Sequence, residues 1–145
     1  MKRRLKKKMS IASPMLWREI PQLYRLVGLK CKKCGYINFP RMGSICLKCG
    51  SAEGFEEHRI SRRGKLVTFT VEHVMPPGFE TPTIMAIVDT EDGARLMVSM
   101  TQAKPDEVKI DMPVELVFRR FGEAEGLLRY GFRAKPAKEA AETKK

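Results

Sequence analysis

In the second half of this 145-residue chain, segments of alternating apolar and polar residues and one almost wholly apolar run, residues 83–90, predict β-strands. Five segments are long enough to form substantial strands, and turn-forming residues separate most of them. The polar stretch between the third and fourth segments, residues 104–110, has room for a single helical turn. In chain order, the predicted strands cover residues 64–75, 83–90, 94–101, 113–121 and 127–134.

Strict alternation also predicts which side chains share a face of each strand. Residues Glu91–Gly93 are expected to form the turn of a hairpin between the second and third strands. One face of the first strand should carry Leu66, Thr68, Thr70 and Glu72, and the residues between them should lie on the other face. One face of the third strand should carry Leu96, Val98 and Met100.

Five strands with a short insert before the fourth fit a small closed barrel. The oligonucleotide/oligosaccharide-binding fold, or OB-fold, has this layout. Closure would bury the strand edges that an open five-stranded sheet exposes. An open sandwich and an SH3-like barrel are the alternatives.

The N-terminal part of the chain predicts a short helix. Ser13 is a good helix cap and Pro14 suits the first turn. We expect about two turns, ending where Pro21 interrupts the pattern. Residues 22–31 then alternate loosely, as a short helical end or a strand would.

All four cysteines lie in residues 31–50, as two Cys-x-x-Cys pairs. Two intervening residues allow both sulfurs of a pair to reach one ion from a tight turn, and two such turns complete a tetrahedral four-sulfur site. Gly35 and Gly50 follow the pairs, where a positive φ is expected. The spacing predicts one structural zinc ion bound by Cys31, Cys34, Cys46 and Cys49.

Other chemistries of the four cysteines remain open. Two disulfides are disfavoured in a cytosolic chain, and a redox Cys-x-x-Cys pair normally stands alone. Iron could occupy the same cage. A catalytic zinc is not expected, because four sulfurs leave no position for a water molecule.

The formal charge of +11 is concentrated at the two ends of the chain. Residues 1–8 carry six basic and no acidic side chains, and residues 133–145 carry five basic and two acidic ones. Such ends are more often solvated tails than binding sites. Because no stretch approaches the roughly 20 continuous apolar residues of a membrane span, we expect a cytoplasmic protein without membrane contact.

The expected architecture is mainly β, with a short helical segment, a rubredoxin-like zinc ribbon and a five-stranded OB-fold barrel. The expected boundaries are a basic tail at 1–12, the helical segment at 13–28, the zinc ribbon at 29–55, the barrel at 56–134 and a disordered tail at 135–145.

No arrangement of residues for catalysis is evident, so we expect a protein that is not an enzyme. His58 and His73 lie in strand-like segments, where a lone histidine usually packs or faces solvent. Trp17 and Phe79 are apolar groups that a small domain need not bury, and they are candidate partner contacts.

Single-stranded nucleic acid is the alternative ligand for a ribbon and OB-fold protein, and its recognition needs exposed aromatic residues and a basic groove. The predicted second and third strands contain no aromatic residue, so we do not expect nucleic acid. The ribbon lysines could bind phosphate weakly, whether from nucleic acid or from CoA.

Several stretches together resemble a known family across most of the chain. They include the two cysteine pairs with Phe39–Arg41 between them, residues 64–79 (GKLVTFTVEHVMPPGF), and the closing RYGFR of residues 129–133. This series is similar to the zinc-ribbon plus OB-fold proteins of formerly unknown function that are described as acyl-CoA-associated. The segment after Pro40 departs from the Phe-Pro-Pro-Arg sequence that is more usual in that family.

The resemblance implies an archaeal, non-enzymatic partner of thiolase-type enzymes. Such proteins hold acetoacetyl-CoA thiolase and hydroxymethylglutaryl-CoA synthase together, so that the second enzyme draws forward the uphill condensation catalysed by the first in the mevalonate pathway. CoA is a further candidate ligand. Of the functional residues that the resemblance implies, only the four cysteines can be assigned to particular positions of this chain.

Overall fold

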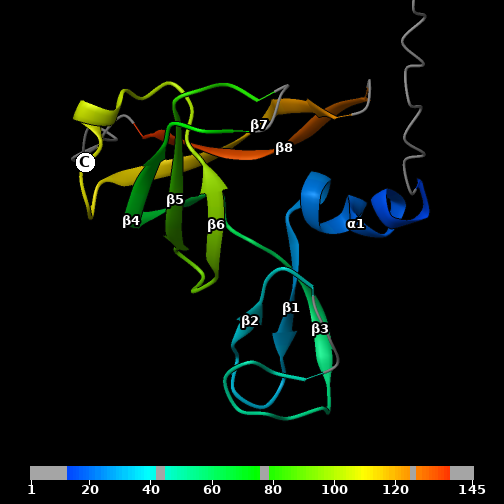
Figure 1. Cartoon of the computed structure of the whole chain (residues 1–145). Coiled ribbons are helices and arrows are strands. Elements are labelled where there is room, and N and C mark those ends of the chain that lie inside the picture. The colour runs from blue at the N-terminus through cyan, green and yellow to red at the C-terminus, as the bar shows by residue number, and fades with distance from the viewer. Residues whose placement is uncertain (1–12, 42–44, 76–78, 125–126, 138–145) are drawn as a thin grey trace, which may run out of the picture.

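A computed structural model describes residues 13–41, 45–75, 79–124 and 127–137. Figure 1 shows a helix and two β-structures, with a small sheet below a larger barrel. The elements are α1 (Ser13–Arg25), β1 (Val27–Cys31), β2 (Ile37–Asn38), β3 (Phe55–Arg59), β4 (Arg63–Glu72), β5 (Thr83–Thr90), β6 (Arg95–Ser99), the 3₁₀ turn η1 (Pro105–Glu107), β7 (Pro113–Ala124) and β8 (Leu127–Pro136). The mainly β architecture expected from the sequence is confirmed.

Helix α1 passes through Pro21 and ends at Arg25, so the expectation that Pro21 would end the helix was wrong. A proline within a helix removes one backbone hydrogen bond and crowds the preceding turn. The turn after Pro21 packs against the barrel, where the Tyr24 ring lies 5.3 Å from the Phe118 ring between centroids. These packing contacts offset the local cost of the proline.

The small sheet contains β1 in its centre, with β2 on one side and β3 on the other, all antiparallel. We call residues 27–59 the ribbon. Strand β3 pairs with β1 from Val27–Arg59 to Cys31–Phe55. The expected boundary at residues 55/56 therefore falls within a strand of the ribbon, and the chain leaves the ribbon through Ile60 and Ser61.

The barrel has the strand order β6-β5-β4-β7-β8, with antiparallel neighbours. A parallel bridge between Met100 and Ala134 joins the two edges, and the Thr101 amide donates to the Ala134 carbonyl at 2.8 Å. The 3₁₀ turn lies between the third and fourth barrel strands, where a helical turn was expected. This near-closed arrangement is that of the OB-fold.

Partway along β4, the set of alternate side chains that points to the core changes, which the alternation pattern did not predict. The register with β5 shifts between Leu66 and Thr68, as a β-bulge does. Consequently, Leu66 packs in the same core as Phe69 and Val71, which strict alternation places on the opposite face. The prediction for β6 is confirmed, because Leu96, Val98 and Met100 are all buried.

An aromatic cluster joins α1 to the β7–β8 hairpin, which extends past the barrel toward the helix (Figure 1). Phe118 lies at its centre, with ring centroids 5.9 Å from Tyr130 and 5.6 Å from Phe132. Tyr24 packs on Phe118, and the Arg62 guanidinium lies 5.5 Å from the centre of the Phe132 ring. Tyr24, Phe118 and Tyr130 remain exposed over more than a third of their surface, so this cluster is also a face open to solvent.

Within the described ranges, the sole α-helix is α1, and no helix there is long and apolar enough to span a bilayer.

Candidate metal centre and the contact between ribbon and barrel

The two cysteine pairs adopt the same backbone turn. The Gly35 amide donates to the Cys31 carbonyl, and the Gly50 amide donates to the Cys46 carbonyl, each at 2.9 Å. Both glycines have a positive φ of about 70°, as the sequence predicted. Each turn leaves its sulfurs pointing toward the other turn.

The four sulfurs, one from each of Cys31, Cys34, Cys46 and Cys49, lie within 4.8 Å of one another. Sγ of Cys31 is 3.8 Å from Sγ of Cys49, and Sγ of Cys34 is 3.6 Å from Sγ of Cys46. A zinc ion bonded to four thiolates at about 2.3 Å places neighbouring sulfurs about 3.8 Å apart. A disulfide would need about 2.05 Å, so these cysteines are free thiols arranged as a metal site.

The thiols of the cluster differ in pKa. Hydrogen bonds from the backbone amides of Cys49 and Lys48 lower the pKa of Cys46 to about 6, although burial opposes them. The Tyr36 amide lowers the pKa of Cys34, but burial and the neighbouring sulfurs outweigh it and raise this pKa to about 11. Since four thiolates repel one another, a cation among them is what allows all four to ionise, and the donor set fits a soft divalent metal.

Asn38 braces the second cysteine turn from inside the ribbon. Its side chain is fully buried; Nδ2 donates to the Ile45 carbonyl at 3.0 Å, and Oδ1 accepts from the Leu47 amide at 3.3 Å. The segment that carries Cys46 is therefore tied to β2 by a side chain as well as by sulfur. Sequence analysis missed this residue, because a lone asparagine before a proline-containing turn carries no distinctive signal.

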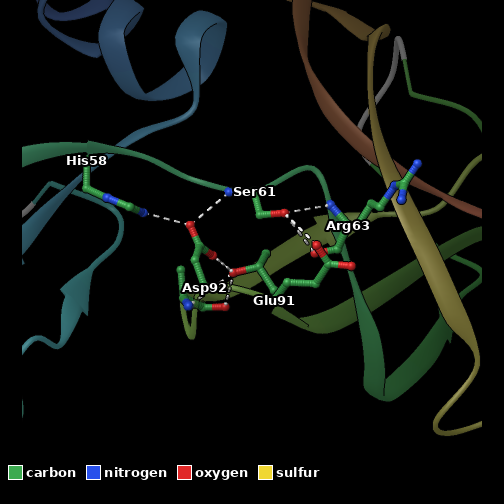
Figure 2. A network of polar contacts seen from close by, with 7 residues as sticks. His58, Ser61, Arg63, Glu91 and Asp92 are labelled. Carbon is green, nitrogen blue, oxygen red and sulfur yellow. Dashed lines mark hydrogen bonds and ion pairs between the residues drawn. The ribbon is translucent and has the colours of Figure 1, made fainter.

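Asp92 connects the ribbon to the barrel, as Figure 2 shows. It lies in the β5–β6 turn, and its Oδ2 atom is 2.8 Å from Nε2 of His58, which belongs to β3 of the ribbon. The same oxygen accepts from the amide of Ser61, in the linker, at 2.9 Å. Its other oxygen accepts from the Thr90 hydroxyl. One carboxylate thus contacts the ribbon, the linker and the barrel.

Neighbouring polar groups extend this contact. The Glu91 amide donates to the Arg63 carbonyl at 3.0 Å, and the Arg63 amide donates to the Ser61 hydroxyl at 3.2 Å. Burial raises the pKa of Asp92, but hydrogen bonds from Thr90, Ser61 and His58 outweigh it and hold this pKa below its usual value. The ionised carboxylate is therefore the form that fits the interdomain contact.

The structure places the other candidate residues apart from the cysteines. Trp17 lies in α1, and its side chain is outside the described part of the structure. Phe79 is half-buried at an apolar pocket between α1, the ribbon and the barrel, while residues 76–78 of the same loop are outside the described residues. His73 is exposed, and His58 contacts Asp92 rather than the sulfurs.

Across the described ranges, the cysteines form the only cluster of histidine, cysteine or acidic side chains arranged to hold a metal ion. Four sulfur ligands leave a tetrahedral ion no open position. The site can therefore crosslink the chain, and it offers no place for a reacting water.

Comparisons with known proteins identify both parts of this architecture. Residues 18–56 match the family model described as "ChsH2, rubredoxin-like zinc ribbon domain", and residues 57–119 match "ChsH2, C-terminal OB-fold domain". The chain belongs to the ChsH2-type zinc-ribbon and OB-fold family. The resemblance seen in the sequence is confirmed.

Relatives of this ChsH2-type chain include scaffold proteins and enzyme subunits. A "DUF35 domain-containing scaffold protein" of Methanocaldococcus jannaschii is 42% identical over 91% of this chain and 94% of its own length. "Benzoylsuccinyl-CoA thiolase subunit BbsA" of Thauera aromatica is 36% identical over 63% of this chain and 61% of its own. Among solved structures, "Ltp2-ChsH2(DUF35) aldolase" aligns with a TM-score of 0.64 and 26% identity, over 90% of this chain and 98% of that one.

Proposed function

We propose that this protein is a non-catalytic scaffold of acyl-CoA metabolism that bridges acetoacetyl-CoA thiolase and hydroxymethylglutaryl-CoA synthase in the mevalonate pathway. Relatives named as scaffold proteins and as a thiolase subunit support the general role. The choice of these two partner enzymes rests on the family resemblance of the sequence.

The observation that carries the proposal is the polar contact through which Asp92 joins the ribbon and the linker to the barrel. Asp92 accepts hydrogen bonds from the ribbon and from the linker while its own turn belongs to the barrel. A bridge between two enzymes needs two faces held at a fixed orientation, because a flexible joint would lose entropy when both partners bind. A metal-crosslinked ribbon and a packed barrel joined in this way supply two such faces.

The metal has a structural role in this proposal. Cys31, Cys34, Cys46 and Cys49 would hold one zinc ion, which would fix the shape of the ribbon. Iron in the same cage would give a coloured protein, so the absorption spectrum and the metal content of a purified sample distinguish the two.

The solvent-exposed aromatic cluster is a candidate partner surface. Tyr24, Phe118 and Tyr130 combine large apolar area with few rotatable bonds, and such residues carry much of the binding energy in protein interfaces. Trp17 on α1 and Phe79 beside the barrel remain proposed partner contacts. CoA remains a proposed ligand of the assembled complex.

Single-stranded nucleic acid is the second candidate, and one observation favours it. Phe118 and Tyr130 form a stacked, exposed pair on β7 and β8, and the Arg62 guanidinium lies over the ring of Phe132, which packs on Phe118. Bases stack on such platforms. Against it, β5 and β6 carry no aromatic residue, although these strands are the usual base-binding surface of an OB-fold.

The deciding experiment is reconstitution from three purified proteins. Mixed with thiolase and synthase, the protein should give one complex on size-exclusion chromatography that neither enzyme forms alone. Removal of residues 1–8 and 138–145 should leave this complex intact. Two enzymes that pass through the column separately in the presence of this protein would refute the proposed bridge.

A further inference from the structure

An apolar pocket of about 280 Å³ opens where α1, the ribbon and the barrel meet. Leu23 of α1, Phe39 of the ribbon and Phe79 of the loop before β5 contribute to its lining. The barrel adds Met85 from β5 and Phe132 from β8. The pocket is therefore built only when all three parts of the chain are in place.

Flexible side chains form much of its wall. Met75, Met85 and Met97 all line the pocket. Methionine has three rotatable bonds and a polarisable sulfur, so it adapts to ligands of different shape. Met97 is 73% exposed, which places it at the mouth of the pocket rather than in the packed core.

A charged group lies among these apolar residues. Arg133 lines the pocket and is only 8% exposed. Its Nη2 atom donates to the Met100 carbonyl at 2.7 Å, while its Nε atom is buried and has no hydrogen-bond partner among the described residues. A guanidinium stays charged, and a buried donor without an acceptor is unfavourable. Arg133 therefore places a charged guanidinium in the wall of the pocket.

The acidic partner of Arg133 does not fully neutralise it. Nη1 of Arg133 is 3.3 Å from Oε2 of Glu80, but the Glu80 side chain is 80% exposed. The Glu80 carboxylate is therefore mostly solvated, and it contacts the guanidinium from the outer side. Among the described residues that line the pocket, Arg133 and Glu80 are the charged ones.

We propose that this pocket binds a small molecule with an apolar chain that ends in a carboxylate. The carboxylate would pair with Arg133, because a guanidinium binds that group in a planar, charge-assisted contact. The chain would lie among the methionine and phenylalanine side chains. A volume near the lower end of small-molecule sites, which span about 300–1,000 Å³, suits a chain of medium length rather than a nucleotide. This site is separate from the metal centre and goes beyond the scaffold role.

The test uses the full, metal-loaded chain with sodium octanoate as the probe. Titration is followed by calorimetry and by NMR of protein labelled at its methionine methyl groups. We expect saturable binding, with the largest shifts at Met85 and Met97. Octan-1-ol, which lacks the charge, should bind at least tenfold more weakly, and octylammonium should not bind measurably.

Two sets of variants test the charge of the site. Arg133→Met should weaken octanoate binding at least tenfold. Because Arg133 is buried and this variant could misfold, an exposed matched pair is needed as well. Met97→Asp and Met97→Lys both remove the thioether and differ in charge at the mouth. Octanoate should bind at least fivefold more weakly to Met97→Asp than to Met97→Lys.

Equal binding of octanoate and octan-1-ol, or equal affinities of the two Met97 variants, would overturn the carboxylate assignment. Failure of octanoate to bind would overturn the small-molecule site. If a short peptide ending in two leucines bound instead, the pocket would be assigned to a partner's chain terminus. These measurements need neither thiolase nor synthase, so their failure would leave the proposed scaffold role untouched.

Discussion

The ribbon and the barrel are stabilised by different means, as their most deeply buried side chains show. In the barrel these are aliphatic, with Leu66, Leu96 and Leu116 almost completely buried. In the ribbon they are Asn38 and two of the cysteines, Cys31 and Cys46. A barrel of this kind folds by removing apolar surface from water. The ribbon contributes few side chains to the apolar core, among them Ile37 and Phe39, and a metal bound by its four cysteines would add a crosslink; structural zinc supplies about 10–16 kcal/mol in small peptides.

The difference explains how a short chain can form two sheets of different construction. A second apolar core would need many more residues, because small domains bury too small a fraction of their surface. A metal site supported by the hydrogen bonds of one asparagine needs only a few residues. The consequence is that the two bodies should fail under different conditions, and this can be tested directly.

Removal of one sulfur should have the largest effect. Cys46→Ser should unfold the ribbon, abolish stoichiometric metal binding and prevent complex formation with the partner enzymes, because the remaining three sulfurs cannot close a tetrahedral site. The barrel should stay folded, since its core does not include this residue. Metal analysis combined with amide NMR of the variant measures both results.

Lys48→Ser is the matched control for this substitution. Lys48 is exposed in the same turn, between Cys46 and Cys49, and should tolerate the change with metal bound. A Cys46→Ser protein that kept its folded ribbon and its partner enzymes would show that the metal is not what holds the ribbon together.

A substitution in the barrel should give the opposite pattern. Leu116→Ala removes a side chain that is 1% exposed, and such changes cost about 2–5 kcal/mol. The barrel should unfold at a lower temperature, while metal release should keep its wild-type midpoint. Circular dichroism reports barrel unfolding, and a colorimetric chelator reports metal release during the same heating. Coincident shifts in both transitions would mean that the two bodies unfold as one.

Much of this organisation could be predicted from the sequence because it depends on local patterns. The apolar run of β5, the alternation in β6 and the Glu91–Gly93 turn predicted a hairpin that the structure confirms. The repeated Cys-x-x-Cys spacing indicated the sulfur cluster, whose members need only two short turns. These features depend on residues close in sequence, so one segment carries the whole signal.

Other features depend on residues far apart and were not predictable. The Asp92 to His58 contact joins residues 34 apart, and Arg133 reaches Glu80 across 53. The bulge after Leu66 lies just past Lys65, the last residue of β4 that pairs with β7, while the pairing with β5 continues to Glu72. The helix continues past Pro21 because it packs on the barrel, and no local pattern carries that information.

A smaller effect is expected at the contact between the two bodies. Asp92→Asn removes the charge that accepts from Ser61 and His58, and a hydrogen bond to a charged group contributes about 1.5–3 kcal/mol. The free energy of unfolding at neutral pH should fall by about this amount. Metal binding should persist, but complex formation with the two enzymes should weaken because the orientation of the ribbon is less restricted.

The pH dependence of this effect has a defined sign. The pKa of Asp92 is lower in the folded state than its ordinary value of 3.8, so its contribution is complete above that value. It is lost as the pH falls through the folded-state pKa. The stability difference between wild type and Asp92→Asn should therefore shrink as the pH is lowered from about 5 toward 3. Urea unfolding at several pH values measures this difference, and a constant gap would show that Asp92 acts through shape alone.

Asp89→Asn makes the same chemical change in the preceding strand and should have the smallest effect. Both oxygens of Asp89 contact the Arg95 guanidinium, each at 2.6 Å, and the resulting ion pair lowers the pKa of Asp89. However, the Arg95 and Asp89 side chains are 60% and 43% exposed, and solvent-exposed ion pairs contribute about 0.2–1 kcal/mol because solvent screens them. The pair also lies entirely within the β5–β6 hairpin, so complex formation should be unchanged. If Asp89→Asn weakened the complex as much as Asp92→Asn, the loss would reflect the hairpin itself, and the joint between ribbon and barrel would not be the feature that partners require.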